Sequence, residues 1–212
     1  MQVADAQREV RTVFVGGFWG QLSASAIWLA SAALGTWGTP RSAILELIVC
    51  GFFIFPATQL LLHLERFQDR CALSIFNARS PLHGVGSTWV HALGYSNPET
   101  AIVGGPASLS KGNPLGKLGM QIAFTLPMTM LLLAPVGAFR LNWFFPAFMI
   151  LLGAHYLPFT FLYGMRMFIP LCAILVGGGV VIAEYYSGSF STGAWVTGVT
   201  LFVFAWIGRA SV

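Results

Sequence analysis

The run from Trp143 to Gly164, WFFPAFMILLGAHYLPFTFLYG, constrains this chain more than any other segment. It is almost wholly apolar, and His155 is its only side chain that ionises near neutral pH. As a helix rising about 1.5 Å per residue, a run of this length covers about 33 Å, enough to cross a hydrocarbon core of about 30 Å. The run therefore predicts a transmembrane helix with His155 near the bilayer midplane.

Pro158 follows His155 by three residues and predicts a helix defect beside the imidazole. Proline has no N–H to donate to the carbonyl of Ala154, and its ring clashes with that carbonyl, so we expect a kink or an unpaired oxygen there. A titratable side chain inside a membrane is a functional-site hypothesis by default. This segment is accordingly the first candidate site.

Composition excludes a soluble globular fold. Across 212 residues, 56% are hydrophobic and 8% are charged, whereas soluble domains carry about 25% charged residues. Lipid must therefore solvate most of the surface, and we expect a multi-pass protein of the cell (inner) membrane. The net charge of +4 reflects membrane topology and does not indicate nucleic-acid binding.

Hydropathy predicts an all-α integral membrane bundle in a single domain covering residues 1–212. The six expected spans cover residues 13–37, 43–63, 118–139, 143–164, 167–186 and 191–208. Residues 64–116 form a long loop, and its start, LLHLERFQDRCALSIFN, has the pattern of an amphipathic helix at a membrane surface. The rest of the loop, from about residue 77 to 116, is rich in Gly, Ser and Pro and suits a cap or a docking surface.

Positive residues flank these spans very unevenly. On the side of the N-terminus lie Arg8, Arg11, Arg66, Arg70, Arg79, Lys111, Lys117, Arg166 and Arg209, and on the other side only Arg41 and Arg140. Because loops rich in Lys and Arg stay in the cytoplasm, both termini are predicted to be cytoplasmic. An odd number of spans would break this pattern.

Helix irregularities and hydroxyl groups gather at a similar depth in several spans. Carriers build midplane binding sites from such broken helices. We therefore expect a ligand site made by His155, Pro158, Thr160, Thr129, Gly177, Gly178 and Gly179. For the three glycines the sequence leaves open close packing, a hinge or room for a ligand.

Three roles remain open for His155. It could be a neutral, hydrogen-bonded packing residue, it could bind or relay a proton, or it could ligate a haem or chlorophyll-like pigment. No other span carries a histidine at depth, and a pigment normally needs a second ligand or a matching pocket. No cofactor and no metal site is therefore expected, and His83 and His91 in the loop lack further ligands at suitable spacing.

Charged residues near the outer ends of the spans predict a vestibule. Glu46 lies early in the second span, Glu184 at the outer end of the fifth, and Arg140 between the third and fourth. A carboxylate near the interface costs less than one at the helix centre. We expect Arg140 to be the best outer partner for Glu46.

Two short motifs carry a resemblance. Asn113-Pro114-Leu115-Gly116 precedes the third span, and Gly153-Ala154-His155-Tyr156-Leu157-Pro158 lies in the fourth, followed by Phe161-Leu162-Tyr163. In these motifs the second half of the chain resembles an uncharacterised family of small bacterial multi-pass membrane proteins. The resemblance implies the architecture and a prominent His155, but no reaction.

The leading functional hypothesis is binding or transport of a small molecule or ion through the site around His155, which could be coupled to protons. The alternative is a non-catalytic accessory or assembly subunit that packs on a membrane partner or on a second copy. An intramembrane enzyme is disfavoured because catalytic motifs such as HExxH and GxSxG are absent from the sequence.

Overall fold

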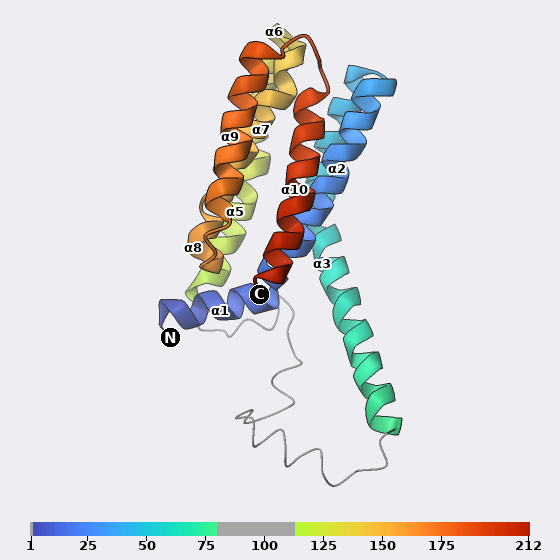
Figure 1. Cartoon of the computed structure of the whole chain (residues 1–212), viewed down its shortest axis with the longest axis vertical. Coiled ribbons are helices and arrows are strands. Elements are labelled where there is room, and N and C mark those ends of the chain that lie inside the picture. The colour runs from blue at the N-terminus through green and yellow to red at the C-terminus, as the bar shows by residue number, and fades with distance from the viewer. Residues whose placement is uncertain (1, 80–112) are drawn as a thin grey trace.

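A computed structural model describes residues 2–79 and 113–212 (Figure 1). Within these two ranges every regular element is a helix and no strand is present. The elements in chain order are α1 (Val3–Val13), η1 (Val15–Gly17), α2 (Phe18–Trp37), α3 (Pro40–Arg79), α5 (Pro114–Met130), α6 (Leu133–Phe139), η3 (Leu141–Trp143), α7 (Phe144–Tyr156), α8 (Phe159–Tyr163), α9 (Phe168–Tyr185) and α10 (Thr192–Ala210).

These helices make the chain an α-helical membrane protein, as predicted. Four segments are long and apolar enough to cross a bilayer: Pro114–Phe139, Leu141–Tyr163, Phe168–Tyr185 and Thr192–Ala210. Two bent pairs also qualify when each is taken as one span, namely Val3–Val13 with Val15–Trp37, bent by 67°, and Pro40–Ile54 with Pro56–Leu64, bent by 55°. The structure thus contains four to six spans among the described residues.

The first span begins differently from the prediction. Gly16 and Gly17 have φ angles of 62° and 83°, a backbone conformation that glycine adopts without strain. They form a turn that separates α1 from α2, so the continuous helix of the first span begins at Phe18 and not at residue 13. Because α1 buries Ala6, Val10 and Val13 on one side, it lies across the end of the bundle (Figure 1).

Two of the predicted spans are interrupted by proline. Pro135 cannot donate to the carbonyl of Leu131, which instead accepts from Ala134 N at 3.3 Å, and the chain breaks between α5 and α6. Pro158 separates α7 from α8 in the same way. The helix defect expected beside His155 is therefore present as a break, and the carbonyl of Ala154 accepts from Leu157 N at 3.2 Å.

The bundle has two groups of helices that meet at α10. α2 packs extensively on α3 and α10, and α7 packs extensively on α9, while α10 also contacts α7 and α9. Trp28 of α2 reaches the second group, with its ring 5.0 Å from that of Phe148 and 5.9 Å from that of Phe145. A largely apolar core therefore connects the two groups.

Both ends of the chain lie at one end of the bundle (Figure 1). Gly16 is close to Val212 and to the carbonyl of Gly208. At the same end Asn113 caps α5 by accepting from Leu115 N at 2.9 Å, and its side-chain amide donates to Ala6 O at 3.2 Å. These contacts connect α1, α5 and the C-terminus.

α3 continues to Arg79, so the start of the expected loop is helical, and its position along a membrane surface stays a prediction. The remaining predictions for the loop, including those for His83 and His91, fall on residues 80–112 and lie outside the described residues.

Candidate functional site

His155 lies in the last turn of α7 and contacts α5 through a single hydrogen bond. Its Nδ1 is 3.1 Å from Oγ1 of Thr125. The same hydroxyl is 2.7 Å from the carbonyl oxygen of Ile122 in its own helix. A hydroxyl has one hydrogen to donate. When Thr125 gives it to Ile122, Nδ1–H of His155 donates to Thr125, and Nε2 remains a hydrogen-bond acceptor.

Aromatic rings hold the imidazole from both sides of the Pro158 break. The ring of His155 is 5.3 Å from that of Phe159 and 6.2 Å from that of Tyr156, both edge to face. Phe159 also stacks on Tyr163 at 5.7 Å. Because such ring pairs prefer defined geometries, the orientation of His155 is set by its packing as well as by Thr125.

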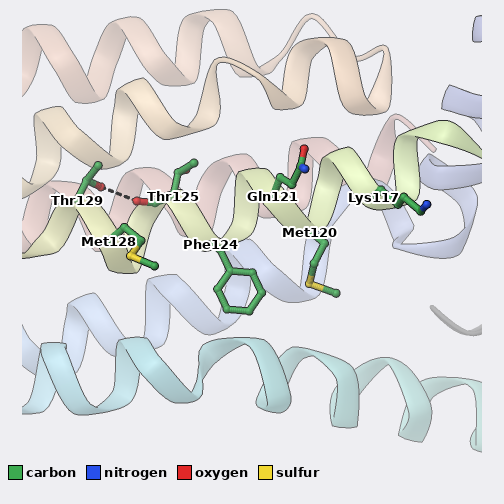
Figure 2. Close-up of a pocket in the computed structure, with 7 residues that line it drawn as sticks. All are labelled: Lys117, Met120, Gln121, Phe124, Thr125, Met128 and Thr129. Atoms are coloured by element: carbon green, nitrogen blue, oxygen red, sulfur yellow. Dashed lines mark hydrogen bonds between the residues drawn. The ribbon is translucent and has the colours of Figure 1, made fainter.

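The hydroxyl that His155 contacts also lines a groove. The groove has a volume of about 620 Å³ and is open along its side (Figure 2). Because the groove is open and lies on one helix, this volume is not that of an enclosed ligand pocket. All seven lining residues belong to α5: Lys117, Met120, Gln121, Phe124, Thr125, Met128 and Thr129.

The lining residues form two rows at helical spacing. Figure 2 shows Gln121, Thr125 and Thr129 along one edge of α5 and Met120, Phe124 and Met128 along the other. Residues four apart lie on the same helical face, which explains both rows. The groove therefore has a polar edge that begins at Lys117 and an apolar edge beside it.

α5 is unusually exposed for a helix of this bundle. Only 11% of the most apolar window of Pro114–Phe139 is buried, against 44% for Leu141–Tyr163. Phe124 is 59% exposed and Met128 71% exposed. The groove face of α5 is thus open to whatever surrounds the protein.

Thr129, Pro158 and Thr160 lie near His155 in different ways. Thr129 lines the groove one turn beyond Thr125 and donates to the carbonyl of Thr125 at 2.8 Å. Pro158 forms the break that follows His155. Thr160 has a buried hydroxyl oxygen with no hydrogen-bond partner in the part of the chain that the structure describes. Thr129 thus lines the groove together with Thr125, whereas His155 reaches only the hydroxyl of Thr125 and does not line the groove.

Gly178 and Gly179 of α9 face α7, Gly177 does not, and none of the three lines the groove on α5. A Cβ at Gly179 would lie 2.6 Å from Cγ1 of Ile150, and one at Gly178 would lie 2.8 Å from Cε of Met149. At Gly177 no atom would come within 4 Å. Of the three uses that the sequence left open, close packing fits Gly178 and Gly179.

Two of the residues expected to form an outer vestibule make contacts other than the expected one. The carboxylate of Glu46 accepts a hydrogen bond from Ser31 of α2, and Arg140 lies over the ring of Trp143 at 4.8 Å. Glu184 is exposed near the end of α9. Among the described residues no ion pair joins either glutamate to Arg140, so Ser31 takes the place proposed for Arg140 beside Glu46.

Sequence reasoning missed Thr125, which connects His155 to the groove. The signal was available in the spacing, because Lys117, Gln121, Thr125 and Thr129 recur every four residues. It also missed Ser31, which is fully buried. No comparable periodicity pairs Ser31 with Glu46, since the two residues lie on different helices.

Two side chains of α2 bury polar atoms that have no hydrogen-bond partner among the described residues. Gln21 is 2% exposed, and neither atom of its side-chain amide has a partner there. The hydroxyl of Ser23 is also buried without one. Within residues 2–79 and 113–212 no group of three His, Cys, Asp or Glu side chains could hold a metal ion.

The helices define a membrane protein of several helices, and its candidate site is the open groove on the exposed face of α5. More particularly, residues 101–210 match the model of DUF7010, a family of unknown function. This segment is over half of the chain, so the protein belongs to that family, and the predicted resemblance to an uncharacterised family is confirmed. No curated protein and no solved structure matches the chain.

Proposed function

We propose that this membrane protein binds a small molecule in the groove on α5, with Thr125 on its polar edge and His155 hydrogen-bonded behind Thr125. The observation that carries the proposal is the hydrogen bond between these two residues, because it connects the deep imidazole to a residue that lines the groove. The groove follows α5 from Lys117 to Thr129, and this length suits an elongated small molecule.

The chemistry of His155 supports a ligand that donates a hydrogen bond. With Nδ1–H directed to Thr125, Nε2 is an acceptor, and inside hydrocarbon no water satisfies it. A ligand hydroxyl or amine would recover part of the cost of burying that nitrogen. Nε2 could bind a proton in place of a ligand donor, and this would couple the site to protons.

Transport across the membrane extends the binding proposal. Pro158 interrupts the helix directly after His155, and discontinuous helices beside a binding site are the elements that move in many carriers. Thr160, whose buried hydroxyl lacks a partner among the described residues, lies just beyond this break. We include it as a group that a moving ligand would meet.

The proposed topology has six spans and cytoplasmic termini in a cell membrane. Support comes from the two chain ends, which lie at one end of the bundle (Figure 1), because an even number of crossings returns the chain to its starting side. The described positive residues beside this end are Arg8, Arg11, Lys117, Arg166 and Arg209.

An accessory or assembly subunit remains the second proposal. Its specific support is that Gly20 and Gly177 face open space, because a methyl group added at either position would have no atom within 4 Å. Small residues on an open helix face allow a partner helix to approach closely. The partner could be another membrane protein or a second copy of this chain.

Ligand-dependent thermal shifts of the purified protein test the binding proposal. A panel of metabolites, ions and lipids would be screened at pH 5.5 and 7.5 with wild type, His155→Ala and Thr125→Val. A ligand that binds the folded state raises the unfolding midpoint, and we expect this rise to be lost in both variants. Thr197→Val is the matched control, because Thr197 is buried in α10 and donates only to Gly193 O of its own helix.

Ligand shifts that persist in folded His155→Ala and Thr125→Val would overturn the proposal. No shift in wild type, together with co-purification of other membrane chains, would favour the accessory-subunit proposal.

A further inference from the structure

The groove on α5 changes from polar to apolar along its length. Lys117 and Gln121 lie at the end next to α1, where Asn113 connects the two helices. Beyond Gln121 the exposed surface comes from Phe124 and Met128. The groove therefore offers a charged end followed by a hydrocarbon wall.

The two threonines do not interrupt that wall with free donors. Thr125 has the Ile122 carbonyl within 2.7 Å, and Thr129 donates to the Thr125 carbonyl at 2.8 Å. A threonine that donates to its own helix turns its hydroxyl toward the backbone. Its methyl group then contributes to the apolar surface.

Lys117 gives the groove a positive charge, and the carboxylate of Glu9 in α1 accepts from Asn113, one turn before Lys117. The segment Pro114–Phe139 contains no Asp or Glu, and among the described residues no ion pair involves Lys117. Gln121, one turn further along, adds an amide that can donate hydrogen bonds to an anion. The charge of this end is complementary to an anionic group and repels a cationic one.

The length of the lining matches one leaflet of a bilayer. Lys117 and Thr129 are twelve residues apart in the sequence, which is about 18 Å along a helix. Half of a hydrocarbon core of about 30 Å is about 15 Å. A chain that begins at Lys117 and follows α5 would therefore end near the midplane, at the level of Thr125 and Thr129.

We propose that the occupant of the groove is an anionic membrane lipid. Its headgroup contacts the Lys117 ammonium and the Gln121 amide, and one acyl chain lies along Met120, Phe124 and Met128. This inference rests on the binding proposed for the groove and names the ligand class, with hydrocarbon and not a hydrogen-bond donor at the depth of Thr125. Anionic lipid is also the partner that clustered positive charge at a membrane surface attracts.

A second copy of the chain suits this groove less well. Two copies paired groove to groove about an axis normal to the membrane would bring the same surface of each together. Lys117 of one copy would then lie near Lys117 of the other, and like charges repel. The headgroup of a lipid has the opposite effect, because it neutralises the charge.

Native mass spectrometry of the purified full chain tests the inference. The protein would be titrated with phosphatidylglycerol or phosphatidylcholine carrying identical oleoyl chains, and the ratio of their binding constants measured. A lysine near a membrane surface contributes about 1 kcal/mol toward anionic lipid, so we expect Lys117→Gln to lower this ratio about fivefold. Arg166→Gln is the matched control, since Arg166 is an exposed cation outside the groove lining, and it should leave the ratio unchanged.

Phe124→Ala separates the inference from the proposed function. Because Phe124 is largely exposed, its truncation should spare the fold and weaken both lipids alike. An unchanged ratio of the two binding constants in Lys117→Gln, or an equal fall in Arg166→Gln, would overturn the anionic-lipid inference. If Phe124→Ala nevertheless lost lipid binding, the groove would remain a binding site. Full binding of both lipids by Phe124→Ala would overturn both proposals. A dimer that dissociates in Phe124→Ala would assign the groove to a second copy.

Discussion

Alanine substitution at Gly177, Gly178 and Gly179 tests how α9 packs on α7. A methyl group at position 179 would lie 2.6 Å from Cγ1 of Ile150 and 2.8 Å from the carbonyl oxygen of Pro146. At position 178 it would meet only the flexible end of Met149, and at position 177 it would meet nothing within 4 Å. Three neighbouring positions of one helix should therefore respond differently to the same change.

The magnitudes follow from two opposing terms. Alanine is a better helix former than glycine by about 1 kcal/mol, and this gain applies at all three positions. Overpacking a close contact costs about 1 to 3 kcal/mol. The upper end applies at Gly179, because the carbonyl of Pro146 moves only if α7 moves. We therefore expect Gly179→Ala to destabilise by about 2 kcal/mol, Gly178→Ala to be nearly neutral and Gly177→Ala to stabilise by about 1 kcal/mol.

Reversible unfolding of the protein in mixed detergent micelles would measure these differences as free energies. A flat profile, in which all three variants change stability by the same amount, would refute the packing argument. A profile with the expected order but with ligand binding lost in Gly177→Ala would instead assign a hinge or a ligand contact to Gly177.

Three further substitutions give expected changes in the same assay or in hydrogen exchange. Ser31→Ala removes the hydroxyl that donates to the half-buried carboxylate of Glu46, and we expect a loss of about 1 to 2 kcal/mol. Asn113→Ala removes the cap on Leu115 N and the bond to α1, which should cost about 1 kcal/mol and speed amide exchange throughout α1. Thr160→Val removes a buried hydroxyl without a partner among the described residues, and should raise the free energy of unfolding by about 1 kcal/mol.

Each of these changes has a conservative control. Glu46→Gln keeps an acceptor for Ser31, so an effect as large as that of Ser31→Ala would argue against the hydrogen bond. Asn113→Asp keeps the cap on Leu115 N, but it cannot donate to Ala6 O and sets a carboxylate against that of Glu9, so it should speed exchange in α1 at least as much as Asn113→Ala. Thr160→Ser keeps the hydroxyl, so stabilisation by this variant would mean that packing, and not polarity, governs the position.

Features that depend on local sequence were predictable. The long apolar runs fix which segments are apolar helices, because backbone groups in hydrocarbon must bond within their own segment. Pro158 interrupts its helix for a covalent reason, since it has no N–H for Ala154. The same reasoning applied to Pro135 would have predicted the break between α5 and α6.

Features that depend on how neighbouring helices pack could not be predicted from the sequence. Hydropathy averages over the turn at Gly16 and Gly17, so it cannot detect that α1 turns away from α2 by 67°. The choice of Ser31 as the partner of Glu46 depends on how α2 packs against α3. The glycines of α9 could have served packing, hinge motion or ligand binding until the positions of Ile150 and Met149 were known.

The groove arises from the way α5 is attached to the rest of the bundle. Asn113 connects its start to α1, Thr125 connects its middle to His155, and Met130 lies 3.9 Å from the position of a methyl group at Gly51 of α3. Between these contacts the face that carries Phe124 has no covering helix among the described residues. α1 is connected to the charged end of α5, and His155 of α7 is connected to its middle. A ligand in the groove would contact α5 between these two connections. Any tilt of α5 on binding would therefore be transmitted to α1 and to α7.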